Sequence, residues 1–167
     1  SGFLYYEHIA PNYTYWQKSY CPYGSISYYA SNSSTIEVPS SITISGHTYP
    51  VKHVSIYGIS GINEVKFSDG IEVVDIEGVS GIRELTIPDS VLYLRVNGCA
   101  NLEKVNLPSN LKVYAGYHGQ SLYGAPLKEI NFPASLVEIG VGALRGSKFK
   151  TLSVPSTVRC VGGAAFQ

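Results

Sequence analysis

Apolar and polar positions alternate in short runs that recur along most of the chain. Three stretches align at a spacing of 20 residues, each with a glycine in the same place, and two further copies follow them. A repeat of this size predicts a solenoid, because one unit cannot bury its own apolar face and must stack on its neighbours. The copies, including a degenerate first one, are 36–40, 54–70, 74–90, 94–110, 125–144 and 147–166.

Each copy holds two alternating runs. Val65 and Phe67 alternate with polar residues in the first run, and the same spacing returns in every later copy. A period of two over a short run predicts a half-buried strand. The strand is ended by a proline such as Pro88, or by the turn residues 68–70 in the one copy without proline. A second run, such as 74–77, gives each coil another strand, so we expect two parallel ladders.

The outward positions of the two predicted ladders differ in chemistry. Those of the first strand are small, polar and of mixed charge, as is usual for a solvated sheet face. Those of the second strand carry the aromatic side chains and place Asp75 beside Arg95. The second-strand columns are His53, Val73 and Tyr93; Ser55, Asp75 and Arg95; and Tyr57, Glu77 and Asn97.

Residues 1–34 do not fit the repeat and contain eight tyrosines and Trp16. The runs 3–6 and 26–29 are predicted as strands of a hairpin across the first coil. We interpret 1–34 as an aromatic-rich N-terminal β cap on a single solenoid domain, 35–167, because the apolar end of a solenoid needs a cover. The alternative is a platform on which sugar rings stack, a role that suits aromatic side chains.

The sequence stops at 164–167, midway through a repeat. Two expectations follow for this end. Either the native sequence continues, or the end packs against another copy in a weak self-association.

An insertion breaks the spacing of 20, because Leu102 and its equivalent Leu127 are 25 residues apart. The inserted residues, about 115–126, are rich in glycine and predict a loop, and loops on a rigid scaffold often carry binding residues. We expect this loop and the aromatic ladder to form a contact surface; the alternative is a tolerated insertion whose tyrosines pack down. The candidate contact residues are Tyr57, Tyr93, Arg95, Tyr117, His118 and Tyr123.

The amino-acid composition excludes some classes of binding partner. The 167 residues include 12 basic and 12 acidic side chains, so no basic patch is available to a nucleic acid or an anionic membrane. No apolar run approaches the ~20 residues of a membrane span. The composition therefore leaves a protein or a glycan as the expected partner.

The residue types of an active site or metal site do not come together in the sequence. No nucleophile elbow, zinc-protease motif, phosphate-binding loop or dinucleotide fingerprint occurs, and the four histidines are scattered. We therefore expect no enzyme activity, metal or cofactor. Cys21, Cys99 and Cys160 form no CxxC pair, so we expect small buried thiols, with one disulfide and a free thiol as the alternative.

The last two copies resemble the repeat of the BspA-like leucine-rich repeat proteins. The resemblance covers about residues 35–167 and implies a mainly β, right-handed solenoid with parallel ladders, on secreted or surface-anchored bacterial proteins that are often adhesive. It brings no catalytic residues. We expect a non-enzymatic surface protein that binds a host protein; the alternatives are a carbohydrate-binding module or a spacer in a larger surface protein. The matching residues are Leu127, Ile130, Phe132, Pro133, Ser135, Leu136, Ile139, Gly140, Ala143 and Leu144, then Phe149, Leu152, Val154, Pro155, Val158, Val161, Gly162, Ala165 and Phe166.

Overall fold

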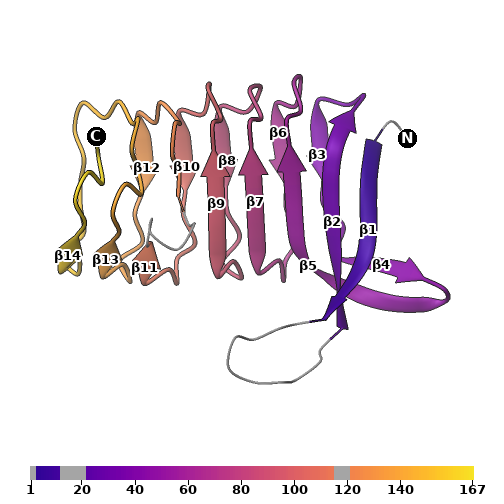
Figure 1. Ribbon diagram of the computed structural model, residues 1–167. Coiled ribbons are helices and arrows are strands. Elements are labelled where there is room, and N and C mark those ends of the chain that lie inside the picture. Colours follow the sequence, from indigo (N-terminus) through magenta and orange to yellow (C-terminus); the bar gives the residue numbers. More distant parts are fainter. Residues whose placement is uncertain (1–2, 12–21, 115–120) are drawn as a thin grey trace.

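The computed structural model describes residues 3–11, 22–114 and 121–167, which wind as successive coils stacked along one axis (Figure 1). No helix occurs among these residues, so none is present that could cross a membrane. The strands are β1 (Phe3–Pro11), β2 (Pro22–Ser31), β3 (Thr35–Glu37), β4 (Ser41–Ile44), β5 (His47–Tyr57), β6 (Glu64–Lys66), β7 (Val73–Glu77), β8 (Glu84–Thr86), β9 (Tyr93–Asn97), β10 (Lys104–Asn106), β11 (Val113–Tyr114), β12 (Glu129–Asn131), β13 (Glu138–Ile139) and β14 (Cys160–Val161).

One wall of the solenoid is a long sheet in the order β1-β2-β5-β7-β9, with β4 added to β5. Strands β5, β7 and β9 are parallel, and Val54 pairs with Val74, which pairs with Leu94. The predicted N-terminal hairpin is confirmed, since β1 and β2 are antiparallel. Strand β2 also pairs in parallel with β5, so the hairpin continues the sheet of the coils.

The second wall is built from three-residue strands and is termed the short-strand wall. It contains the sheet β12-β10-β8 and the pair β3-β6. Val105 pairs with Leu85 on one side and with Ile130 on the other, so the predicted apolar row is present. A third sheet, β11-β13-β14, joins the later coils. The parallel-ladder solenoid predicted from the repeat is therefore confirmed.

A column of glycines marks one corner of every coil. Gly58, Gly78 and Gly98, aligned by the repeat, are followed by Gly124 and Gly146, and all five have a positive φ between 62° and 97°. The N–H of each of the first four donates to the carbonyl oxygen of the residue before the next glycine, as from Gly98 to Tyr123 at 2.9 Å. A Cβ on Gly146 would lie 3.3 Å from Cα of Gly124. Glycine is needed for both the backbone conformation and the close approach.

The inward aliphatic side chains of all coils form one core, in which Ile56, Ile76 and Val96 are fully buried. Cys99 belongs to this core and is buried, as expected. The expectation is wrong for Cys160, which is exposed because it lies on β14, the edge strand of its sheet, where the neighbouring Val161 is exposed as well. Both thiols are free, and Cys21 lies outside the described residues.

Candidate contact surface

The outward side chains of the long sheet form three parallel rows, and this surface is termed the tyrosine face. The rows follow from the pairing of β2, β5, β7 and β9 and from the bridge that continues β9 to Ser121. From Tyr57 to Tyr123 the third row consists of the residue that precedes each glycine corner. Tyr29 precedes Ala30 and is placed in the row by its stacking on Tyr57. The rows are Ser25, His53, Val73 and Tyr93; Ser27, Ser55, Asp75, Arg95 and Ser121; and Tyr29, Tyr57, Glu77, Asn97 and Tyr123.

An ion-pair network holds the centre of the tyrosine face. Arg95 Nε donates to Asp75 Oδ1 at 2.9 Å, and the Arg95 guanidinium also pairs with the Glu77 carboxylate. The predicted neighbour pair of Asp75 and Arg95 is therefore confirmed. Their side chains are only 20% and 24% exposed, so solvent screens this pair less than a fully exposed one.

Tyr57 joins this network to the N-terminal hairpin. Its hydroxyl donates to Asp75 Oδ2 at 3.1 Å, and its ring stacks on Tyr29 with centroids 5.7 Å apart. Burial raises the pKa of the Tyr57 hydroxyl, and the Asp75 carboxylate adds to that rise. The phenol is thus held neutral and serves as a hydrogen-bond donor.

The far end of the third row is also aromatic. Tyr123 is 50% exposed, and the Arg145 guanidinium lies 5.9 Å from the centroid of its ring, within cation–π range. Between the two aromatic ends, the Ser121 hydroxyl donates to Asn97 Oδ1. An exposed tyrosine therefore stands at each side of the polar centre, since Tyr29 is 54% exposed.

The structure brings together some of the candidate contact residues. Tyr57 and Arg95 meet through Asp75, and Tyr123 lies in the row of Tyr57. Tyr93 is on the same face of β9, partly buried, two positions before Arg95. Tyr117 and His118 lie outside the described residues, so their part in the surface stays a prediction.

Two residues of this surface were missed by sequence reasoning. Tyr29 falls within the predicted cap. Its place in the row of Tyr57 could have been found by extending the repeat backward through β2, where Tyr28 pairs with Ile56. Arg145 precedes Gly146 as Tyr123 precedes Gly124, and this spacing is the signal that places both side chains at one corner.

The tyrosine face has few groups suited to bond-making chemistry. Ser55 Oγ lies 3.1 Å from His53 Nε2, but Ser55 is 3% exposed and so presents no accessible nucleophile. Within residues 3–11, 22–114 and 121–167, no three His, Cys, Asp or Glu side chains are grouped as metal ligands would be. Exposed rings around a fixed ionic centre are instead suited to non-covalent contact.

The fold and sequence have known counterparts. A leucine rich cell surface protein from Faecalibacterium prausnitzii is similar in fold, with a TM-score of 0.50 and 17% identity over 85% of this chain. This chain spans about half, 47%, of that structure. A leucine-rich repeat protein from Bacteroides ovatus matches at 17% identity with a TM-score of 0.38, over 92% of this chain and 59% of its own length. A search among curated proteins gave no match.

The sequence model described as the BspA type leucine rich repeat region matches six copies, over residues 24–117 and 56–167. These matches start within β2 and reach the last coil. The coils, their parallel ladders and the repeat thus lead to one assignment: the chain belongs to the BspA-type leucine-rich repeat family.

Proposed function

We propose that this protein is a non-enzymatic bacterial surface protein whose tyrosine face binds an extracellular partner protein. The observation that carries the proposal is that exposed tyrosines flank an arginine held by two carboxylates on the long sheet. Tyrosine and arginine are enriched where protein interfaces concentrate their binding energy. Leucine-rich repeat family membership supports a binding role, and the description of the Faecalibacterium structure as a cell surface protein supports an extracellular one.

The ionic centre reduces the entropic cost of binding. Arg95 is held by two carboxylates, and Tyr57 is held by its bond to Asp75 and its stack on Tyr29. Side chains that are ordered before binding lose less conformational entropy when a partner docks. The exposed rings of Tyr29 and Tyr123 would then supply the apolar contact area.

The test measures binding of the purified chain to a panel of immobilised extracellular host proteins. For any partner that binds, Tyr29→Ala with Tyr123→Ala should weaken affinity by about tenfold or more, since interface hot spots contribute ~2 kcal/mol or more. The matched control is Glu129→Ala with Asn131→Ala, two exposed residues of β12 on the short-strand wall, which should leave affinity unchanged. Equal loss in both double variants, or in neither, would contradict the proposal.

A carbohydrate ligand is the second candidate, because the Tyr29 and Tyr57 rings lie beside the carboxylates of Asp75 and Glu77. Aromatic faces accept sugar rings and carboxylates accept their hydroxyl groups. A glycan array separates the two functions. Glycan binding that disappears in Tyr29→Ala, with no protein bound, would replace the first proposal, whereas no binding of either kind would favour a spacer.

A further inference from the structure

The short-strand wall is interrupted between β6 and β8. Every other pair of neighbouring strands from β3 to β12 on this wall is hydrogen-bonded, with β6 joined to β3 and β8 joined to β10. Among the residues that the structure describes, no backbone hydrogen bond connects 63–67 with 83–87. On the long sheet the same two coils are fully paired through β5 and β7.

The missing bonds can be named by comparison with the next coil. There, the N–H groups of Glu103 and Lys104 donate to Arg83 O at 2.9 and 3.1 Å, and Ile87 N–H donates to Asn106 O at 3.0 Å. The equivalent donors at the interruption are the N–H groups of Arg83, Glu84 and Phe67, and the equivalent acceptors are the carbonyl oxygens of Asn63 and Thr86. Two strand edges therefore face each other with their polar groups available.

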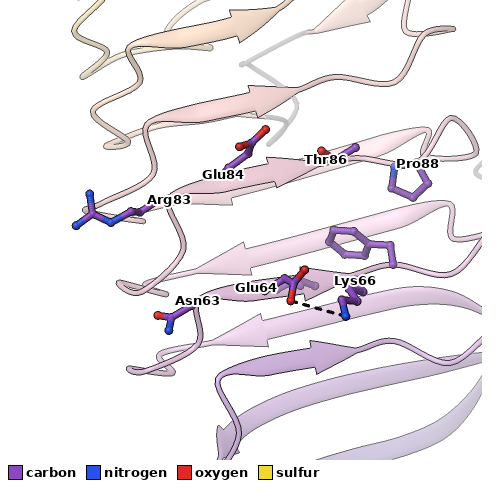
Figure 2. A pocket seen from close by; sticks show the side chains of 9 residues that line it. Asn63, Glu64, Lys66, Arg83, Glu84, Thr86 and Pro88 are labelled. Carbon is purple, nitrogen blue, oxygen red and sulfur yellow. Dashed lines mark ion pairs between the residues drawn. The ribbon is translucent and has the colours of Figure 1, made fainter.

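A cavity of about 680 Å³ lies between these edges, and Figure 2 shows its lining side chains on both strands. This volume is in the range of ligand sites. Val65, Phe67 and Pro88 supply apolar lining, and charged side chains of β6 and β8 line the cavity as well. We term this cavity the seam.

The seam is closed at both ends. At one end the coils touch so closely that a Cβ on Gly81 would lie 2.1 Å from Ile62 O. At the other end Ser90 Oγ accepts a bond from Gly70 N–H and donates to Ile71 O at 2.7 Å. The coils are thus pinned at two corners and separate between them.

We propose that the seam is a binding site for an extended acidic segment of a partner protein, which adds its backbone to the open edges of β6 and β8. Backbone donors and acceptors alternate along an extended peptide as they do along a strand edge, so a peptide can satisfy both edges. Cα atoms of β6 and β8 lie within 8 Å of each other, whereas a strand inserted between them needs about 9.6 Å, twice the usual spacing. The seam must therefore widen by at least about 1.6 Å, with the paired β5 and β7 as its hinge, and the two corner contacts must loosen as it does so.

The lining of the seam has two acidic and two basic side chains, and the most weakly paired of them is a cation, which favours an acidic segment. Glu84 is bound to Lys104 at 3.0 Å, and Lys66 lies between Glu37 and Glu64. Arg83 is 74% exposed and makes only a 3.9 Å contact with Glu103, which is itself bonded to Lys128 at 2.7 Å. A carboxylate of the partner would complete the weakly paired Arg83. This site lies on the wall that does not carry the tyrosine face, so the proposal does not rest on the proposed function.

The first experiment is amide hydrogen exchange on the full chain, with and without a capped hexapeptide that alternates valine and threonine around one aspartate. In the free protein the amides of Phe67 and Glu84 should exchange at least tenfold faster than their paired equivalents Ile87 and Lys104. Millimolar peptide should slow them and shift their amide resonances. An N-methylated peptide should have no effect. Exchanging the aspartate of the peptide for asparagine, or making Arg83→Ala, should weaken binding severalfold, whereas Arg159→Ala, at another exposed arginine, should not.

A disulfide lock supplies the matched control. In a Cys21→Ser, Cys160→Ser background, Lys66→Cys with Thr86→Cys should close the seam on oxidation and abolish peptide binding, with recovery on reduction. The same treatment of Asn106→Cys with Asn131→Cys, at strands already paired, should leave binding unchanged. Slow exchange at Phe67 and Glu84 in the free protein, peptide shifts located elsewhere, or no shifts at all would each overturn the proposal.

Discussion

The two walls of the solenoid are built from the same repeat and differ in continuity and in surface. The long sheet runs without interruption from β1 to β9 and carries large side chains tied by ion pairs and ring contacts. The short-strand wall has three-residue strands, polar side chains with exposed ion pairs, and the seam between β6 and β8. Longer strands give each coil more ladder bonds, so the long sheet keeps the coils in register while the other wall can depart from ideal stacking.

The largest expected effect comes from truncating the core behind each wall. Ile76 on β7 is fully buried, whereas Ile130 on β12 is only partly buried. We expect Ile76→Ala to lower the free energy of unfolding by about 2–5 kcal/mol and Ile130→Ala by clearly less, because less apolar surface returns to water. Urea unfolding followed by circular dichroism measures both. Equal losses would show that the two walls contribute alike.

The next effect tests the corner that bounds the seam. Gly81→Ala would place a methyl group against the backbone oxygen of Ile62, which cannot move aside as a side chain would. We expect a loss of about 1–3 kcal/mol. Gly163→Ala is the control, since its Cβ would meet nothing within 4 Å, and its stability should change little. If Gly81→Ala left the free energy of unfolding unchanged, the coils would not be in close contact at Gly81 and Ile62.

A smaller effect is expected from the ionic centre of the tyrosine face. Asp75→Asn keeps the shape of the side chain but removes the charge that Arg95 and Tyr57 share, so we expect a loss of about 1–2 kcal/mol. Lys128→Gln, which breaks an exposed pair with Glu103 on the other wall, should change stability less. Thermal unfolding at low and high salt distinguishes the two, because salt should affect the exposed pair more.

The smallest expected effect is a difference in reactivity between two thiols, which does not involve a change in stability. Burial raises the pKa of the Cys99 thiol, so at neutral pH it holds almost no reactive thiolate, whereas Cys160 is exposed. In a Cys21→Ser chain, iodoacetamide should label Cys160 readily and Cys99 only after unfolding, as mass spectrometry would show. Rapid labelling of Cys99 in the native chain would indicate local opening of the core.

Much of the fold could be predicted because the period of the repeat determines which residues pair across adjacent coils. A spacing of 20 placed Asp75 beside Arg95 and Leu85 beside Val105, and both pairs are present. The outward chemistry of each ladder followed from alternation alone. The exposure of Cys160 did not, since a lone cysteine gives no sign of its direction unless its strand is first aligned with the others.

The rest could not be predicted because it depends on how neighbouring coils meet. The residues of β6 and β8 alternate like those of every other copy, so nothing in their pattern marks the seam. A local difference is Ser68, where later copies have proline; its hydroxyl is buried without a hydrogen-bond partner within the described part of the chain. Likewise, Tyr29 joins the tyrosine face only because β2 pairs with β5, a long-range contact that the hairpin itself does not require.

The glycine corner has a consequence for how this architecture tolerates change in length. Six residues, 115–120, separate β11 from Ser121 in the sequence. Gly124 nevertheless stacks on Gly98, since a Cβ added to Gly124 would lie 3.6 Å from Cα of Gly98. The corner therefore restores the stacking of the coils after the extra segment, and the later coils continue in the same alignment. Loops of different length could therefore be exchanged ahead of this corner, and a grafted sequence there would be displayed without disturbing the turns beyond it.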